Sequence, residues 1–248
     1  MTARKANRGY LVHSYEVDAW NRVLPQAVLL YMQDLATLQS EECGVGIARL
    51  RDNRLGWMLY QMDYTLTKDF FAYDTIDLST VSTAFDTLYA YRKFWFRNSE
   101  GQIIGEAKSK WVLFDFEKRK IAKKPDWLRE AYGLTGDEKD KLSFSKIPTR
   151  FEPMHAHEIK VGYADIDINR HTNNARYLIW AIEGMSLEWI RKHRVRHVNV
   201  IFKCETRLGE NIRIETKQEE KESIHRVKKE DGKLAAVLEI EWESVEKE

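Results

Sequence analysis

The chain contains a sequence repeat, and this duplication limits the possible folds more than any other feature. Residues 15–30 (YEVDAWNRVLPQAVLL) align with residues 163–178 (YADIDINRHTNNARYL) at an offset of 148, with five identities in sixteen positions. An apolar segment follows each match, at 27–39 and at 175–190, and each is long enough for about four helical turns. The repeat predicts two similar domains, each with a buried helix. A single α+β domain with coincidental symmetry is the alternative.

After each helical segment, apolar and polar residues alternate with the period of two that is typical of β-strands. In the first half the alternating segments are 91–98 and 108–116, with a turn at Asn98–Gly101 between them. In the second half, a turn at Glu230–Gly232 precedes a half-buried strand at 233–243. This order predicts an α+β fold of two tandem hotdog domains, in which an antiparallel sheet wraps around a long central helix. The predicted boundaries are 1–135 for the N-terminal hotdog domain, 136–152 for a polar linker and 153–248 for the C-terminal hotdog domain.

Composition narrows the classes of partner and the compartment. The 248 residues include 40 basic and 39 acidic side chains, for a net charge of +1, so we expect no general attraction for nucleic acid or for a membrane surface. Cys43 and Cys204 are the only cysteines, and two distant cysteines are typical of a reducing compartment. No apolar segment is long enough to predict a signal peptide or a membrane helix. We therefore expect a cytoplasmic protein without membrane insertion. A homodimer is possible.

The second copy has a D-x-N-x-H cluster, formed by Asp167, Asn169 and His171, immediately before its predicted helix. At the offset of 148, the first copy has Ala19 and Val23 in place of the aspartate and the histidine. A packing scaffold has no need of these two side chains at a helix entrance, whereas a reaction centre does. In an extended segment the three side chains of the cluster would point to the same side. We therefore predict that the cluster is catalytic.

The predicted helix N-terminus complements this cluster. The helix is expected to begin near Asn173, and the first backbone N–H groups at Asn173 and Asn174 can bind a carbonyl oxygen as it becomes an oxyanion. A carboxylate, an amide, an imidazole and a helix N-terminus together suit acyl transfer to water. Each residue taken alone also has a structural interpretation, because aspartate and asparagine are ordinary helix caps. Only the asparagine of the cluster has a counterpart at this offset, Asn21, which we expect to be structural.

The segment DIDINRHTNNARYLIW resembles the D-x-D-x-N-x-H-x-N-N-x-x-Y-x-x-W signature of the acyl-acyl-carrier-protein (acyl-ACP) thioesterases of plants and bacteria. The resemblance covers nearly the whole chain, including LPQAVLLYMQDLATLQSEECGVG and KSKWVLFDFEKRKIAKKP in the first half. It implies hydrolysis of fatty acyl-ACP thioesters, which releases free fatty acid and ends chain elongation. It also implies that Asp167, Asn169 and His171 are reactive and that the family's later carboxylate is Glu205. The N-terminal domain, as the degenerate copy, is then expected to hold the acyl chain.

The resemblance also bears on the attacking group. Plant members have a cysteine immediately after the glutamate, whereas this chain has Thr206 there and its nearest thiol at Cys204. On a strand these two residues would face opposite to Glu205, so Cys204 is expected to be a packed apolar residue and a thiol mechanism is disfavoured.

We expect Glu205 or Asp167 to be the general base on water, with Asn169 and His171 orienting the water or the thioester carbonyl. Direct attack by Asp167 through an anhydride is the alternative.

Several other chemistries lack their motifs. The chain has no G-x-S-x-G elbow and no glycine-rich phosphate loop, so we expect no cofactor, and no metal either. His155 and His157 are interpreted as surface histidines in a linker. A hotdog enzyme acting on coenzyme A thioesters, a hotdog dehydratase and a non-catalytic acyl-binding regulator remain as alternatives. The basic runs 191–196 and 118–124 are candidates for docking the carrier protein, because acyl carrier proteins are acidic.

Overall fold

The computed structural model of the chain describes residues 3–136, 138 and 140–245. Residues 1–2, 137, 139 and 246–248, which fall at the ends of the predicted domains and inside the predicted linker, lie outside the described residues. The chain divides into two compact units. The first contains residues 3–23 and Val28–Phe144, and the second contains Leu24–Ala27 and residues 145–245.

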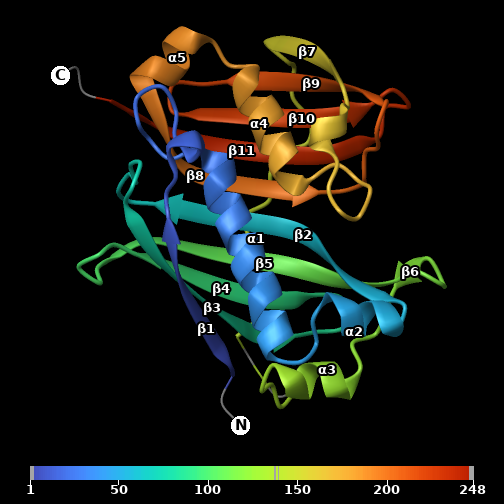
Figure 1. Cartoon of the computed structure of the whole chain (residues 1–248). Helices are drawn as coiled ribbons and strands as arrows, with labels where there is room; N and C mark the ends of the chain where they lie inside the picture. Colours follow the sequence, from blue (N-terminus) through green and yellow to red (C-terminus); the bar gives the residue numbers. More distant parts are fainter. Residues whose placement is uncertain (1–2, 137, 139, 246–248) are drawn as a thin grey trace. The chain divides into compact units, whose positions relative to one another are not determined.

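The elements of the first unit are β1 (Lys5–Leu11), the 3-10 helix η1 (Ser14–Glu16), α1 (Pro25–Glu42), α2 (Ile47–Asp52), β2 (Leu55–Leu66), β3 (Thr75–Phe85), β4 (Ala90–Arg97), β5 (Ile103–Asp115), β6 (Lys120–Ile121) and α3 (Asp126–Ala131). The main strands form an antiparallel sheet in the order β1-β3-β4-β5-β2, and the short β6 pairs with β5. Helix α1 lies across one face of this sheet (Figure 1). It begins at Pro25, in the short stretch Leu24–Ala27 that is grouped with the second unit. Proline suits this first position because the N–H group that it lacks would have no partner within the helix.

The local sequence explains how β4 and β5 form. Phe94 and Phe96 of β4 are fully buried and alternate with the less buried Lys93, Trp95 and Arg97. The predicted turn at Asn98–Gly101 joins the two strands, and the Asn98 carboxamide oxygen accepts hydrogen bonds from two backbone N–H groups at 3.1 and 2.9 Å. Gly101 closes the turn with a φ of 76°, a left-handed conformation that glycine adopts without strain. The turn prediction is therefore confirmed.

The elements of the second unit are β7 (His155–Lys160), the 3-10 helix η2 (Tyr163–Asp165), α4 (Asn174–Glu183), α5 (Leu187–Lys192), β8 (His193–Phe202), β9 (Asn211–Gln218), β10 (Glu222–Lys229) and β11 (Leu234–Ser244). Its antiparallel strands follow the order β8-β11-β10-β9-β7, and α4 packs against β9, β10 and β11 (Figure 1). Each unit is thus an antiparallel sheet around a central helix. The prediction of two tandem hotdog domains is confirmed.

The central helix of the second unit is shorter than predicted. The sequence indicated one helix over 175–190, but α4 ends at Glu183 and α5 begins at Leu187. Gly184 follows α4, and a Cβ atom at this position would collide with the ring of His157. Ser186 then starts α5 by accepting a hydrogen bond from the Trp189 N–H group at 3.2 Å. A close-packed glycine and a strong cap together divide the apolar stripe between two helices.

Part of the predicted linker is packed against the second unit. Ile147 is buried in a cluster with Ile224 of β10 and Val237 of β11. The guanidinium of Arg226 lies 4.0 Å from the ring centre of Phe151. The strand at 233–243 was predicted to be half-buried, and this is confirmed toward its end, where Glu241 and Glu243 are exposed. Toward its start the prediction is wrong, because the segment 145–151 covers Val237 on the second face.

Candidate active site

The D-x-N-x-H cluster lies in a tight turn between η2 and α4, so the predicted extended segment is wrong. The Asp167 carboxylate accepts hydrogen bonds from the Asn169 backbone N–H at 2.8 Å and from the Asn169 amide at 3.4 Å. The Asp167 N–H donates to the His171 carbonyl oxygen at 2.9 Å and closes the turn. Arg170 adopts the left-handed conformation, with a φ of 65°. An aspartate that binds the backbone two residues ahead favours a turn over a strand, which explains the difference.

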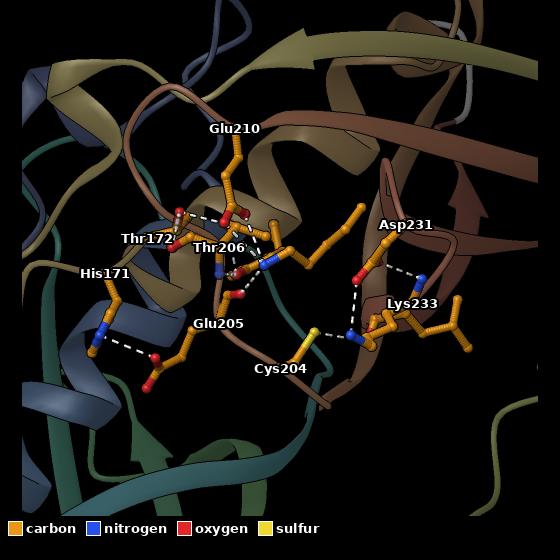
Figure 2. A network of polar contacts seen from close by, with 11 residues as sticks. His171, Thr172, Cys204, Glu205, Thr206, Glu210, Asp231 and Lys233 are labelled. Atoms are coloured by element: carbon orange, nitrogen blue, oxygen red, sulfur yellow. Dashed lines mark hydrogen bonds and ion pairs between the residues drawn. The ribbon is translucent and has the colours of Figure 1, made fainter. Parts of the chain in front are cut away.

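This turn places His171 against Glu205 (Figure 2). The His171 Nε2 atom is 3.0 Å from the Glu205 Oε2 atom, and the side chains are 27% and 35% exposed, so both can meet a substrate. Glu205 lies in the loop after β8 rather than on a strand. The structure therefore joins the predicted residues in two pairs, Asp167 with Asn169 and His171 with Glu205, and the backbone of the turn connects the pairs.

A buried cluster of three hydroxyl groups positions the His171–Glu205 pair. The Thr206 Oγ1 atom lies 2.6 Å from Thr172 Oγ1 and 3.0 Å from the Tyr177 hydroxyl. The Thr172 backbone N–H also donates to the Thr206 carbonyl oxygen at 3.0 Å. Burial raises the pKa of Tyr177 to about 12, so its hydroxyl remains neutral. Because Thr172 follows His171 and Thr206 follows Glu205, these bonds fix the separation of His171 and Glu205.

Lys229 of β10 holds the Glu205 loop from another side. Its Nζ atom donates to the Glu205 carbonyl oxygen at 3.1 Å and forms an ion pair with Glu210 at 2.9 Å. Neither Lys229 nor the hydroxyl cluster was predicted from the sequence. Tyr177 is the tyrosine of the resembled signature, so a signal existed for it. Lys229 reaches the loop only through the folding of β10, and no local pattern predicts that.

Cys204 is not bonded to either side chain of the His171–Glu205 pair. Its Sγ atom lies 3.2 Å from the Leu234 carbonyl oxygen, and Figure 2 shows the sulfur on the side of Glu205 away from His171. Burial raises the pKa of the Cys204 thiol, which disfavours a reactive thiolate. Cys204 was expected to face opposite to Glu205 because both were placed on a strand. That placement is wrong, because β8 ends at Phe202.

Asn173 and Asn174 begin α4, as the cap and the first helical residue. The Asn173 side chain accepts a hydrogen bond from the Ala175 N–H at 2.9 Å, and the Asn173 N–H donates to the Asp165 carbonyl oxygen at 2.8 Å. The Asp165 carboxylate forms an ion pair with Arg176 at 2.5 Å. Because these groups already bind within the chain, the oxyanion role of Asn173 and Asn174 stays a prediction.

The first copy contains the same turn, one residue away from the predicted alignment. The Asp18 N–H donates to the Arg22 carbonyl oxygen at 2.8 Å, and the Asp18 carboxylate accepts from the Trp20 N–H at 2.8 Å. Asp167 makes the corresponding bonds in the second copy, so the structural offset is 149 (167 minus 18). Asn21 then corresponds to Arg170, and their φ angles are 63° and 65°.

The predicted counterparts of the catalytic cluster are therefore wrong. Asp167 does not align with Ala19, because Asp18 is its counterpart, and Asn169 does not align with Asn21. The alignment at 148 maximised identities, whereas the hydrogen bonds of the turn require one more residue. Only the hydrogen bonds and φ angles of the two turns show that the offset is 149 rather than 148.

At the correct offset, Trp20 replaces Asn169 and Arg22 replaces His171. The Arg22 guanidinium forms an ion pair with the Asp18 carboxylate at 2.7 Å and lies 4.9 Å from the Trp20 ring centre. The Asn21 side chain accepts a hydrogen bond from the Ala72 N–H at 3.1 Å, which agrees with a structural role. The copies still differ in chemistry, but they differ in the histidine and asparagine rather than in the aspartate.

His155 and His157 were interpreted as surface histidines of a linker, and this is wrong. Both belong to β7 and are partly buried. In the sheet register His155 faces Thr216, which in turn faces the fully buried His225. Within residues 3–136, 138 and 140–245, no group of three or more histidine, cysteine, aspartate or glutamate side chains is arranged to hold a metal. No helix in the same part of the chain is long and apolar enough to cross a membrane.

Comparison with known proteins supports the interpretation of both units. The chain is 24% identical over 213 residues to oleoyl-acyl carrier protein thioesterase 1, chloroplastic, of Arabidopsis thaliana, covering 79% of this chain and 59% of that protein. It is 20% identical to the chloroplastic palmitoyl-acyl carrier protein thioesterase of Gossypium hirsutum, covering 80% and 51%. The chain thus spans between half and three-fifths of the length of these curated relatives.

Solved structures show the same fold. A Lactobacillus plantarum protein assigned as an oleoyl thioesterase superposes with a TM-score of 0.91 at 22% identity, covering 99% of this chain and 98% of that one. The 12:0-ACP thioesterase of Umbellularia californica superposes with a TM-score of 0.84 at 18% identity, covering 97% and 98%. Residues 3–132 match the family model of the acyl-ACP thioesterase N-terminal domain, and residues 149–244 match that of the C-terminal domain. The chain therefore belongs to the acyl-ACP thioesterase family.

Proposed function

We propose that this chain hydrolyses fatty acyl-ACP thioesters to free fatty acid and the thiol of the carrier protein. The observation that carries the proposal is the His171–Glu205 pair, at 3.0 Å in the domain that matches the C-terminal family model. The first unit has Arg22 in place of the histidine and uses it in a closed ion pair with Asp18. The relatives that match are named as thioesterases of acyl carrier proteins. One reactive centre in the second unit is consistent with these observations.

The pair can activate a water molecule. In the tautomer that suits this contact, His171 Nε2–H donates to Glu205 and Nδ1 keeps a lone pair for a proton of water. The water oxygen attacks the thioester carbonyl carbon while its proton passes to His171, and Glu205 stabilises the imidazolium. When the tetrahedral intermediate collapses, the carbon–sulfur bond breaks and the proton passes to the leaving sulfur. This step yields one fatty acid and one carrier thiol for each water consumed.

Asp167 and Asn169 have a separate role in this proposal. The Asp167 carboxylate holds both the backbone N–H and the side-chain amide of Asn169, which leaves it poorly suited to act as base or nucleophile. Asn169 is exposed and supplies an amide donor to the carbonyl oxygen as negative charge develops there. The dipole of α4, which begins at Asn174, adds to this stabilisation.

The first unit supplies a pocket for the acyl chain. A small cavity lies between α1 and the sheet. Its apolar lining includes Ala36 of α1 and the aromatic side chains of Trp57, Phe85, Trp111 and Tyr132. Aromatic and alanine walls suit an aliphatic chain, whose burial contributes about 0.8 kcal/mol per methylene.

The test compares each reactive residue with its counterpart in the first unit. His171→Ala and Asn169→Ala should each lower kcat on an acyl-ACP by at least about 100-fold, since each removes a proton acceptor or an oxyanion donor. Arg22→Ala and Trp20→Ala, at the equivalent positions, should retain turnover in folded protein. Glu205→Gln should behave like His171→Ala, because the amide cannot stabilise the imidazolium.

Near wild-type turnover in folded His171→Ala and Glu205→Gln enzymes would contradict the site, and a dead Arg22→Ala enzyme would indicate a second reactive centre. The same assays with acyl-coenzyme A substrates separate the proposed activity from that of a coenzyme A thioesterase. The cytoplasmic location and a homodimer stay predictions.

A further inference from the structure

We propose that the loops around the His171–Glu205 pair form the docking face for the acidic acyl carrier protein. The face, called the entrance face below, has three cations, Arg170, Lys203 and Arg207, and three apolar side chains, Tyr163, Ile168 and Leu208. This inference rests on the proposed function, because a carrier must bring its thioester to this pair.

Hydrogen bonds hold the loops of the entrance face side by side. The turn that carries Ile168 and Arg170 is joined to the loop of Arg207 by the Thr172–Thr206 bonds. That loop is joined to the segment before η2 through the Gly209 N–H, which donates to the Val161 carbonyl oxygen at 2.9 Å. The six side chains therefore come from η2 and from loops that border one reactive centre.

The cations of the entrance face have no acidic partner among the described residues. Arg170, Lys203 and Arg207 are exposed, and none of them is in an ion pair in that part of the chain. The neighbouring acids are already engaged, Glu205 with His171 and Glu210 with Lys229. The face thus has positive charge available for an anionic partner.

The apolar side chains of the face are unusually exposed. Tyr163 is 91% exposed, Ile168 is 83% exposed and Leu208 is 61% exposed. Exposed large apolar side chains that gather beside a functional site are typical of interaction surfaces. Cations beside apolar anchors suit a partner with an acidic, partly apolar surface, which is the surface that an acyl carrier protein offers.

The backbone of Arg170 gives an independent argument. Its φ of 65° disfavours arginine, whereas asparagine is several-fold enriched in this region. The first copy has Asn21 at the equivalent position, with a φ of 63°. The second copy keeps a less suitable residue in the same turn, and strained residues that persist beside a reactive centre commonly serve binding or catalysis. Docking a negatively charged partner accounts for the arginine.

The two basic runs predicted for this role differ from the entrance face. Arg194 and Arg196 share the Glu243 carboxylate at 2.6 Å, and Lys192 forms an ion pair with Glu188 at 2.6 Å. Three of the four cations in the run 191–196 therefore already have an acidic partner. In the run 118–124, Lys120 and Lys123 are exposed, but they lie in the first unit and no described bond links them to the reactive pair. They are suitable matched controls.

The experiment measures two substrates with charge and apolar variants of the full chain. One substrate is an acyl-ACP, and the other is the same acyl group on N-acetylcysteamine, a neutral thiol without carrier protein. Arg170→Asn with Arg207→Gln should lower kcat/KM for acyl-ACP at least tenfold, mainly through KM. Added salt should lower the activity of wild type on acyl-ACP, and it should lower the activity of the double variant less. Activity on the neutral thioester should stay within twofold of wild type.

Lys120→Gln with Lys123→Gln is the matched charge control and should leave both substrates unchanged. Leu208→Ser should likewise lower kcat/KM for acyl-ACP only. Leu187→Ser, which alters another exposed leucine, this one on α5, should leave both substrates unchanged. Because Arg170→Asn places a favoured residue at a left-handed position, the variant should melt no lower than wild type.

Wild-type kinetics of the Arg170→Asn and Arg207→Gln double variant on acyl-ACP would overturn the proposal, as would equal losses on both substrates. If wild-type enzyme hydrolysed neither substrate, the proposed function would fail. Docking is then decided by the equilibrium binding of acyl carrier protein to wild type and to the double variant. Equal binding would reject the entrance face.

Discussion

Replacing His225 with glutamine should reduce the acid sensitivity of the second unit. His225 is fully buried, and its two ring nitrogens lie 2.9 Å from the Thr216 hydroxyl and 2.8 Å from the Ser223 hydroxyl. Burial, and to a smaller extent the nearby His155 and His157, lowers the pKa of His225 to about 3. The ordinary value is about 6.5. Folding therefore favours the neutral ring.

The sign of the effect follows from this lowered pKa. Stabilisation by neutral His225 is fully present above about pH 6.5 and is lost as the pH falls toward about 3. In this range the ring is protonated in the unfolded chain but stays neutral in the folded chain. Each pH unit between the two pKa values costs about 1.4 kcal/mol. Lowering the pH from about 7.5 to about 5 should thus lower the free energy of unfolding by about 2 kcal/mol through His225 alone.

The assay is urea denaturation followed by tryptophan fluorescence at both pH values. Glutamine keeps one donor and one acceptor but does not titrate, so His225→Gln should lose about 2 kcal/mol less than wild type between the two pH values. Other titrating groups contribute equally to both proteins and cancel in the comparison. His157, whose pKa burial also lowers, gives a second variant, His157→Gln, for which a smaller effect of the same sign is expected. Equal losses in wild type and His225→Gln would refute the reasoning.

Two further predictions concern the reactive pair and the acyl pocket. Thr206→Val removes a fully buried hydroxyl that binds Thr172 and Tyr177, so it should lower the free energy of unfolding by about 1–3 kcal/mol. It should also lower kcat about tenfold with little change in KM, and unchanged kcat in steady-state assays would show that the cluster does not position the pair. Ala36→Phe fills part of the cavity in the first unit and should shift the preference toward shorter acyl chains, as kcat/KM over a chain-length series would measure. An unchanged profile in folded Ala36→Phe would place the acyl chain elsewhere.

The sequence predicted the architecture because hydrophobic patterns depend on residue type alone. Alternation along 91–98 and the turn at Asn98–Gly101 appear in the structure where they were expected. The D-x-N-x-H cluster precedes a helix as predicted, and Glu205, proposed from family resemblance, contacts His171. The catalytic roles of these residues stay predictions. What failed was local geometry. Asp167 forms a side-chain hydrogen bond that converts an expected strand into a turn.

Other parts of the site depend on contacts between distant segments. Thr172 and Thr206 are 34 residues apart and become neighbours only when the β8 loop meets the turn. The offset of the repeat shows the same limit, because counting identities cannot recognise that Asp18 and Asp167 make equivalent bonds. A pattern of residue types predicts which face of a helix or strand is buried. It does not predict which atoms share a hydrogen bond.

The packed segment 145–151 affects how this protein can be dissected. A C-terminal fragment cut at residue 153 would match the domain boundary suggested by composition, yet it would lack Ile147 and Phe151. Val237 would then face water and Arg226 would lose its aromatic neighbour, so the fragment would expose an apolar strand surface prone to self-association. A fragment that begins near Ser145 keeps this cover. Exchange of halves between related enzymes should therefore transfer the segment together with the second unit.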